Sequence, residues 1–250
     1  MARVLVTGST DGIGLETAEQ LLRLGHDVVL HARSAERAAA AGLPGVPVVV
    51  GDLASLAETK ALGRDAGQFD VVVHNAGIGG QDERRTTGDG LERTFQVNVL
   101  APYVLTALMP KPTRLVYLTS GLESVGIADL DDLQYERKPW HGMQAYSDSK
   151  LHDVALAFAV ARLWPRVRSN AVDPGWIRTK LGGPSATDGL PEGAETQVWL
   201  ATSDDPAATV TARYFKRRTD LKANPAAYDR SVQDALLAAC ASLSGVELPE

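Results

Sequence analysis

The chain has 250 residues, of which 44% are apolar, and a formal net charge of -6 at pH 7. This length and apolar content suit one domain with a large buried core. Acidic and basic residues are interspersed, which argues against nucleic acid or an anionic membrane surface as a partner. The single cysteine, Cys240, excludes an intramolecular disulfide, and its apolar neighbours predict a buried, unreactive residue in a terminal helix.

The ends and the histidines of the chain narrow the class of protein further. No leader sequence precedes the first apolar run at Arg3, and the longest apolar stretch, Val154 to Ala161, is too short to span a bilayer. We therefore expect a cytoplasmic protein without a membrane anchor. The five histidines are scattered without metal-ligand spacing, so we expect no metal site.

Short apolar runs alternate with longer helical patterns along the whole chain. The expected strands are Arg3–Thr7, Asp27–Leu30, Pro47–Val50, Asp70–His74, Arg114–Thr119 and Val167–Ala171. The expected helices are Ile13–Leu24, Ser34–Ala41, Ser55–Gly63, Leu91–Met109 and Ala145–Leu163. Because the hydrophobicity of the strands is continuous rather than alternating, both faces of the sheet should be buried. The sequence thus predicts a single α/β domain over residues 1–250, a doubly wound parallel sheet flanked by helices.

A glycine-rich turn joins the first strand to the first helix and reads Thr7-Gly8-Ser9-Thr10-Asp11-Gly12-Ile13-Gly14. Glycines also occur in plain tight turns, so the turn alone is weak evidence. At this place, however, a dinucleotide pyrophosphate can approach backbone N–H groups and a helix N-terminus. We expect cofactor contacts from the residues of this turn, namely Gly8, Ser9, Thr10, Asp11, Gly12, Ile13 and Gly14.

Tyr146 and Lys150 lie four residues apart in the expected helix Ala145–Leu163, and therefore on one helix face. The positive charge of Lys150 lowers the cost of ionising the Tyr146 phenol, which makes it a usable acid or base near neutral pH. Such a pair occurs by chance in many helices. Its weight comes from Ser120, which follows the fifth strand at the carboxyl edge where open α/β sheets bind ligands.

In this order, the glycine turn, Asn75-Ala76-Gly77, Asn98, Ser120 and Tyr146-Ser-Asp-Ser-Lys150 resemble the motifs of the short-chain dehydrogenase/reductase family. The long segment between Ser120 and Tyr146 is similar to the retinol-dehydrogenase-like and carbonyl-reductase-like branch. The resemblance implies a Rossmann-type fold, a nicotinamide cofactor, and hydride transfer between that cofactor and a carbonyl or alcohol carbon.

The resemblance also assigns roles to four catalytic residues. Tyr146 would transfer the proton, Ser120 would orient the substrate oxygen, Lys150 would assist the tyrosine and hold the ribose, and Asn98 would hold a water of the proton relay. Thr119 is the neighbouring alternative to Ser120, and a simple buried asparagine is the alternative for Asn98. His74 replaces the first Asn of the family's Asn-Asn-Ala-Gly signature, and we expect it to be a hydrogen-bonded histidine at a strand end.

Further cofactor contacts follow from the same resemblance. Asp52 and Leu53 would contact the adenine, and the segment Asn75, Ala76 and Gly77 would line the crevice. The nicotinamide carboxamide would bind to the segment after the sixth strand, at Pro174, Gly175, Ile177 and Thr179; Tyr146 and Lys150 would also contact the cofactor.

The end of the second strand predicts NADP(H) in preference to NAD(H). Ala32 stands where NAD-preferring members carry an acidic residue, and Arg33 offers a planar donor fork suited to a 2′-phosphate. Asp11 departs from this pattern, because many NADP-dependent members carry a basic residue there. Arg33, with Arg37 one turn further on, would have to outweigh the Asp11 carboxylate.

These observations predict an NADPH-dependent carbonyl reductase or alcohol dehydrogenase. The nameable pocket residues favour an apolar small-molecule substrate: Leu122, Trp140, Met143, Trp176 and Leu181. Trp140 and His141 could equally be packing residues. The alternatives are a cofactor-binding regulatory protein without turnover, and an epimerase or dehydratase of the same family.

Two features of the chain leave further expectations. The Gly/Pro-rich segment 181–193 predicts a substrate lid, with an ordinary surface loop as the alternative. The apolar stretch Val154–Ala161 suits either a buried helix or the helix pair through which family members form homo-oligomers.

Overall fold

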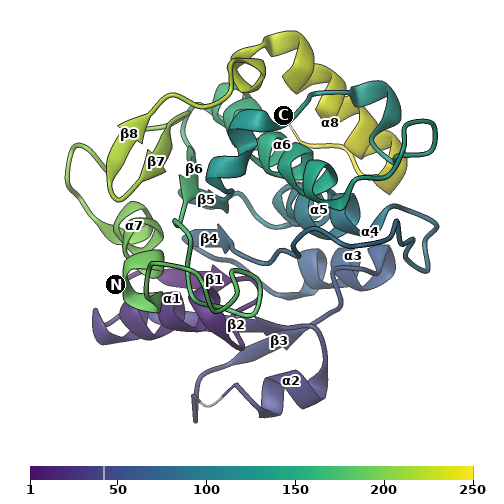
Figure 1. The fold of residues 1–250 in the computed structure, drawn as a ribbon. Coiled ribbons are helices and arrows are strands. Elements are labelled where there is room, and N and C mark those ends of the chain that lie inside the picture. Colours follow the sequence, from purple (N-terminus) through teal and green to yellow (C-terminus); the bar gives the residue numbers. More distant parts are fainter. Residues whose placement is uncertain (42, 250) are drawn as a thin grey trace.

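The computed structural model describes residues 1–41 and 43–249. One sheet runs through the described chain in the strand order β3-β2-β1-β4-β5-β6-β7-β8 (Figure 1). The strands are β1 (Arg3–Val6), β2 (Asp27–Ala32), β3 (Val48–Val50), β4 (Val71–His74), β5 (Arg114–Leu118), β6 (Arg168–Asp173), β7 (Tyr214–Lys216) and β8 (Thr219–Leu221). All neighbouring strands are parallel except β8, which pairs antiparallel with β7.

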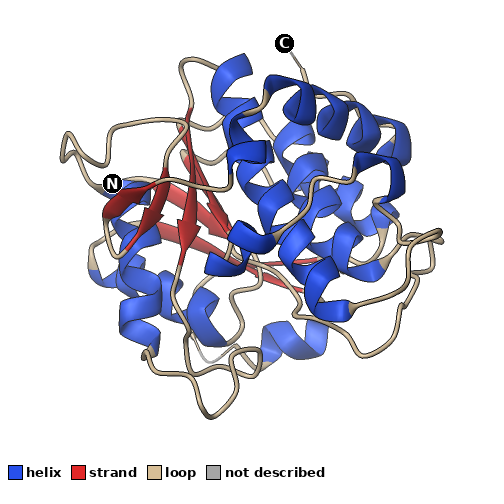
Figure 2. Cartoon of the chain, turned by 45° about the horizontal axis from the view of Figure 1, so that its top comes forward, coloured by secondary structure: helices blue, strands red, loops and turns tan. Residues whose placement is uncertain are grey.

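Helices cover both faces of the sheet (Figures 1 and 2). One layer consists of α1 (Gly12–Arg23) and α7 (Leu190–Thr202), and the other of α3 (Leu56–Asp65), α5 (Ala101–Leu108), α6 (Gly142–Leu163) and α8 (Arg230–Ser244). The short helices are α2 (Ala35–Ala39) beside β2 and β3, and α4 (Arg93–Phe95). Leu5 of β1 belongs to one apolar core while its neighbours Val4 and Val6 belong to the other, because successive side chains of a strand point to opposite faces. This alternation confirms the predicted doubly wound α/β sheet.

The six expected strands are present, and the differences lie in one helix that the pattern did not show and in one expected helix that is interrupted. α7 begins at Leu190, inside the segment predicted as a loop, and Pro191 is tolerated there because it lies in the first turn. The expected helix Leu91–Met109 is interrupted by a π-helical segment at Gln96–Leu100. Cys240 is buried in α8 as expected, and burial raises the pKa of its thiol.

The strand order reverses direction at β1, since the chain moves outward through β2 and β3 and then returns to β4 on the other side. In open α/β sheets a ligand crevice forms outside the carboxyl ends of the strands at such a point. The glycine turn follows β1, Asn75 follows β4, Ser120 lies just beyond β5 and Pro174 follows β6. The fold therefore brings the predicted site residues to one edge of the sheet. None of the helices in the described ranges is long and apolar enough to cross a membrane.

Candidate active site

The glycine turn needs glycine for two separate reasons. Gly8 and Gly12 adopt φ angles of +63° and +57°, the left-handed region that favours glycine. At Gly14 the limit is space, since a Cβ there would lie 2.4 Å from both the Gly8 carbonyl oxygen and the Asn75 Nδ2. Any side chain at position 14 would thus push apart the turn and the end of β4.

His31 of β2 links the glycine turn to the end of β3 through its two ring nitrogens. The backbone N–H of Gly8 donates to His31 Nδ1 at 2.9 Å, and His31 Nε2 lies 2.8 Å from the Gly51 carbonyl oxygen. Because Nδ1 accepts, the ring proton must be on Nε2, which donates to Gly51. Burial lowers the pKa of His31, which favours this neutral form. His31 was not predicted as a site residue from the sequence, although a histidine inside an apolar strand indicates a specific hydrogen-bonding role.

Ser9 joins β1 to β2 through its hydroxyl, which donates to the Val6 carbonyl at 2.8 Å and accepts from the His31 N–H at 2.9 Å. Its side chain is fully buried. A cofactor contact by Ser9 stays a prediction.

The N-terminus of α1 fits an anionic group. Asp11 occupies the N-cap position, but no side chain of the described residues caps the helix. The first-turn N–H groups of Gly12, Ile13 and Gly14 are therefore available to a phosphate, which the helix dipole also favours. This donor set fits the pyrophosphate of a dinucleotide cofactor.

The Asp11 carboxylate is held by two cations. Arg37 Nη2 lies 2.7 Å from Asp11 Oδ2 and also donates to Thr10 Oγ1 at 3.1 Å, while Lys180 Nζ lies 3.0 Å from the same Asp11 oxygen. Partial burial raises the pKa of Asp11, but the hydrogen bonds from Arg37 and Lys180 outweigh it, so the pKa lies below its usual value. Arg37 was predicted from the sequence as a further partner of a 2′-phosphate, whereas Lys180 was not predicted as a site residue.

Arg33 and Asp52 lie at the ends of β2 and β3. Arg33 is exposed and makes no hydrogen bond or ion pair to another described residue, while Ala32 before it is buried. Asp52 Oδ1 accepts from the Ala54 N–H at 2.9 Å, and Leu53 is buried. The Arg33 guanidinium is thus free for a ligand, whereas part of the Asp52 carboxylate already fixes the turn after β3.

The segment after β4 connects the glycine turn with the catalytic residues. Asn75 Nδ2 donates to the carbonyl oxygens of Thr7 and Gly8 at 2.8 and 3.2 Å, and the N–H groups of Asn75 and Ala76 both donate to Thr7 Oγ1 at 3.0 Å. A Cβ at Gly77 would lie 3.5 Å from Lys150 Nζ. Gly77 therefore brings the backbone after β4 close to the lysine ammonium.

Asn98 lies in the middle of the π-helical segment and clamps the chain after β4. Its Oδ1 accepts from the Ile78 N–H at 2.8 Å, and its Nδ2 donates to the Ile78 carbonyl and to Ser149 Oγ, both at 3.0 Å. π-helical turns are frequent at functional sites. The interior asparagine thus ties the crevice to α6 by its side chain.

His74, the residue before this segment, is only half hydrogen-bonded. Its Nε2 lies 3.1 Å from Thr106 Oγ1, whereas its Nδ1 has no partner among the described residues. Burial lowers the pKa of His74 to about 3, so the ring is neutral.

Lys150 and Tyr146 lie side by side on α6 as the spacing predicted. Lys150 Nζ is 5.8 Å from the centre of the Tyr146 ring and donates to the Leu118 carbonyl at 2.9 Å and to Asp153 Oδ2 at 2.8 Å. Both partners lie within the described chain, and they leave the third lysine N–H available. Tyr146 is 8% exposed, so its phenol is shielded from bulk solvent.

The two hydroxyls after β5 differ in their bonding. Thr119 Oγ1 donates to the Lys150 backbone carbonyl at 2.6 Å and is buried. Ser120 is half-buried and its oxygen accepts from the Leu122 N–H at 3.3 Å, which leaves the serine proton free to donate. This geometry favours Ser120 over Thr119 as the group that meets a substrate oxygen.

The segment after β6 lies opposite the glycine turn. Gly175 has a φ of +97°, Ile177 is buried, and the Thr179 methyl lies 3.5 Å from where a Gly12 Cβ would be. The following residues to position 189 are loop, and Trp176 Nε1 donates to the Gly182 carbonyl at 2.9 Å. This segment therefore lies next to the N-terminus of α1. The predicted lid follows it directly in the chain.

The predicted pocket residues separate into two groups. Four are large apolar side chains that are 40% or more exposed: Leu122, Met143, Trp176 and Leu181. Trp140 instead packs its ring edge against Tyr135 and donates from Nε1 to the Gln81 carbonyl at 3.1 Å, and His141 caps α6. Trp140 and His141 are therefore packing and capping residues.

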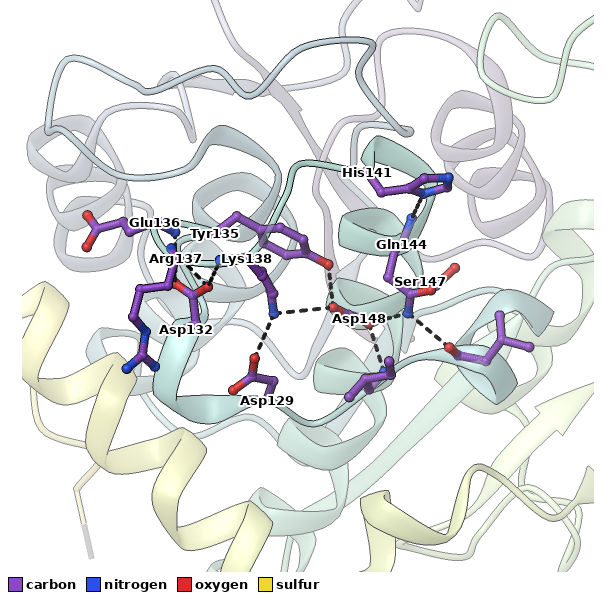
Figure 3. Close-up of polar contacts among 12 residues, drawn as sticks. Asp129, Asp132, Tyr135, Glu136, Arg137, Lys138, His141, Gln144, Ser147 and Asp148 are labelled. Atoms are coloured by element: carbon purple, nitrogen blue, oxygen red, sulfur yellow. Dashed lines mark hydrogen bonds and ion pairs between the residues drawn. The ribbon is translucent and has the colours of Figure 1, made fainter.

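The insertion between Ser120 and Tyr146 is fixed to α6 through Asp148 (Figure 3). The Asp148 carboxylate accepts from the Tyr135 hydroxyl at 2.5 Å, from Gln144 Nε2 at 2.7 Å and from the Ile127 N–H at 2.8 Å. Lys138 adds an ion pair to Asp129 at 3.2 Å. The insertion is thus anchored to the helix that carries Tyr146 and Lys150. Nowhere in residues 1–41 and 43–249 do His, Cys, Asp and Glu side chains form a group that could hold a metal ion.

Comparison with known proteins assigns this arrangement to a family. Residues 2–121 match the short chain dehydrogenase family. The whole chain is 40% identical to the short-chain dehydrogenase chyC of Penicillium rubens, over the full length of that protein. The chain belongs to the short-chain dehydrogenase/reductase family.

Two further comparisons extend this assignment. Human retinol dehydrogenase 13 is 31% identical over 98% of this chain and 85% of its own length. The solved structure of an uncharacterised protein of Mycobacterium paratuberculosis superposes with a TM-score of 0.88 and 26% identity, over all of this chain and 96% of the other. This short-chain dehydrogenase/reductase is therefore an oxidoreductase of CH–OH and C=O groups, in a family that uses NAD(P).

Proposed function

We propose that this short-chain dehydrogenase/reductase is an NADP(H)-dependent carbonyl reductase or alcohol dehydrogenase of apolar small molecules. The observation that carries the proposal is the convergence of Tyr146, Lys150 and Asn98 beside Gly77, at the end of the crevice that begins with the uncapped N-terminus of α1. A proton donor and an anion site thus lie along one edge of the sheet.

The four predicted catalytic residues divide the proton chemistry between them. Bound nicotinamide supplies or accepts the hydride at the substrate carbon. Tyr146 donates its phenolic proton to the carbonyl oxygen, and Ser120 polarises that oxygen with its free hydroxyl proton. Lys150 stabilises the resulting phenolate through its charge, and its remaining N–H would hold the ribose. Asn98 keeps the chain after Gly77 in place through its two hydrogen bonds to Ile78.

Preference for NADP(H) rests on charge at the end of β2. Ala32 provides no carboxylate to bind a ribose 2′-hydroxyl or to repel a phosphate, and the free Arg33 guanidinium suits a 2′-phosphate. Asp11 would repel a 2′-phosphate if its carboxylate were unpaired. Arg37 and Lys180 already neutralise that carboxylate, so it does not argue against NADP(H). The cluster carries one negative and two positive charges, so its net field attracts a phosphate.

An apolar substrate is proposed from the rim of the crevice. Met143 and Trp176 are each 52% exposed, and Leu181 is 54% exposed. Met143 lies on α6 three residues before Tyr146, and the Leu181 side chain lies 3.3 Å from where a Gly79 Cβ would be. Exposed large apolar side chains near a polar site are typical of a site for an apolar ligand. The likeness to a retinol dehydrogenase supports the same class. We further propose that the loop 181–189 closes over this substrate as a lid that is hinged on the first turn of α7.

The experiment that tests this function has a binding arm and a turnover arm. The dissociation constants of NADPH and NADH are compared, and a panel of apolar and charged ketones, aldehydes and secondary alcohols is screened by NADPH absorbance. We expect tighter NADPH binding and turnover of apolar carbonyl compounds. Equal affinity for the two cofactors would contradict the cofactor preference, and turnover confined to charged substrates would contradict the substrate class.

A further inference from the structure

Lys150 has an ionic partner that the four proposed catalytic residues do not include. Asp153, one turn further along α6, places its Oδ2 2.8 Å from Lys150 Nζ. The side chains of Lys150 and Asp153 are 6% and 3% exposed, so this is a buried ion pair. The residue positions 146, 150 and 153 share one helix face, with the lysine between the phenol and the carboxylate.

Stability alone does not explain a buried pair of this kind. Taking two charges out of water is costly, and the attraction between them often fails to exceed that cost. An apolar pair of similar volume would serve the core as well. A buried carboxylate in contact with the proposed catalytic lysine therefore points to a role in the chemistry of that lysine.

We propose that Asp153 is a positioning residue that holds the Lys150 ammonium in place and offsets its charge, and so sets the pH range in which Tyr146 exchanges its proton. This inference rests on the proposed function. Asp153 acts through Lys150 and has no assigned contact with substrate. The ammonium donates to Asp153 and to the Leu118 carbonyl, so one further N–H would remain for the ribose of the cofactor.

The electrostatics of the pair give the inference a measurable signature. Burial lowers the pKa of Lys150, but the Asp153 carboxylate outweighs this effect, so the lysine pKa is raised and the lysine stays charged. Burial raises the pKa of Asp153 to about 6, against the opposing effect of Lys150. Above pH 6 the site is a neutral ion pair beside Tyr146, and below pH 6 it is a lone ammonium.

The charged and titratable groups around Asp153 do not obscure its titration. On its own helix the facing charged group is Lys150, which in turn faces Tyr146. From β5 the Tyr117 hydroxyl interacts with Asp153, and it remains neutral because burial raises its pKa. Tyr117 is bonded to Thr106 at 2.8 Å, not to the carboxylate. Between pH 5 and 8 Asp153 is therefore the group expected to change the charge on Lys150's surroundings.

The test that does not need a substrate is a titration of the lysine itself. The protein is labelled with ¹³C at lysine Cε, and the Lys150 signal is assigned among the seven lysines by its loss in Lys150→Arg. We expect the Lys150 signal to shift with a midpoint near pH 6 in the unmodified protein and to lose this step in Asp153→Asn. A Lys150 signal whose pH dependence is the same in the unmodified protein and in Asp153→Asn would overturn the inference, whatever the enzyme's substrate.

The second test is the pH profile of alcohol oxidation with the best substrate found. In Asp153→Asn the lysine charge is no longer offset, so the acidic limb of kcat should move lower by about one pH unit while KM stays unchanged. Asp153→Glu, which restores the charge, should return the limb toward its original position. Asp65→Asn, an exposed acid at the far end of α3, is the charge-matched control.

A profile that is merely scaled down, with its midpoint unmoved, would show a structural role only and would overturn the proposal. If Asp153→Asn does not fold, the lysine titration of the unmodified protein and of Asp153→Glu decides.

Discussion

The Lys180 ammonium lies 3.0 Å from the Asp11 carboxylate and so ties the segment after β6 to the glycine turn after β1. The two residues are 169 positions apart in the chain, and both flank the crevice in which the cofactor is proposed to bind. The same carboxylate also binds Arg37 of α2. Asp11 is therefore an anchor for two cations at the crevice, and this geometry leads to the first prediction.

Asp11→Asn should strengthen NADPH binding. Without the carboxylate, Arg37 and Lys180 are free to act on the 2′-phosphate, so the NADPH dissociation constant should fall by roughly 3- to 10-fold at low salt. The affinity for NADH should stay the same, because NADH lacks that phosphate. Isothermal titration with both cofactors measures this, with Asp65→Asn as the control. Weaker NADPH binding in Asp11→Asn would mean that the anchored geometry of the cations matters more than their charge.

The double change Ala32→Asp with Arg33→Ala should reverse the cofactor preference. The new carboxylate can bind a ribose 2′-hydroxyl and repels a 2′-phosphate, while the planar donor fork is removed. The ratio of kcat/KM for NADPH and NADH, measured with one substrate, reports the change. A variant that still prefers NADPH would place phosphate recognition on Arg37 and Lys180.

The loop 181–189 should be the most labile interior segment of the protein without ligand. Residues 190–193 should be protected from the start, because they form the first turn of α7. Amide exchange by mass spectrometry, with and without NADPH and a substrate analogue, resolves the two parts. We expect protection of residues 181–189 to rise only when both ligands are present. An unchanged exchange rate would make the loop a passive connector and shift specificity to the insertion held by Asp148.

The stability of the folded protein should fall as the pH drops from 7 to 5. Burial lowers the pKa of His74 to about 3 and of His152 to about 4, below the ordinary value for histidine, so the unfolded chain binds more protons than the folded one below pH 6.5. Each of these histidines should cost about 2 kcal/mol of unfolding free energy between pH 7 and 5. Asp153, whose pKa is raised by burial, acts in the opposite direction and offsets part of this loss.

Urea unfolding at the two pH values measures this dependence. His152→Leu should remove about 2 kcal/mol of the pH effect, because that ring no longer gains a proton on unfolding. An unmodified protein that is equally stable at pH 7 and 5 would show that these rings are already protonated in the folded state.

The sequence was sufficient for the sheet and for the order of the site residues along its edge. Continuous apolar runs such as Val71–His74 identify buried parallel strands, and Tyr146 and Lys150 must share a helix face once α6 exists. β7 escaped notice because its three residues, Tyr214 to Lys216, end in a lysine and do not form a continuous apolar run, and α7 did because its N-terminus is built from Gly189, Leu190 and Pro191.

The missed site residues depend on contacts between distant parts of the chain. Lys180 forms an ion pair with Asp11, and His31 bonds to Gly8 and Gly51. Only the folded sheet brings these residues together. Asp153 is different, since its i, i+3 spacing from Lys150 was visible in the sequence. What the spacing could not show is that both charges are buried, and burial is what makes the pair informative.

The central claim is that Tyr146 supplies the proton for hydride transfer to a carbonyl carbon, and isotope transfer tests it most directly. NADPH deuterated at the transferring C4 position is incubated with the best carbonyl substrate, and the alcohol product is analysed by mass spectrometry. We predict one deuterium in the product from the unmodified enzyme, and a loss of rate of at least about 100-fold in Tyr146→Phe with NADPH affinity nearly unchanged. Deuterated product formed at an undiminished rate by Tyr146→Phe would contradict the account.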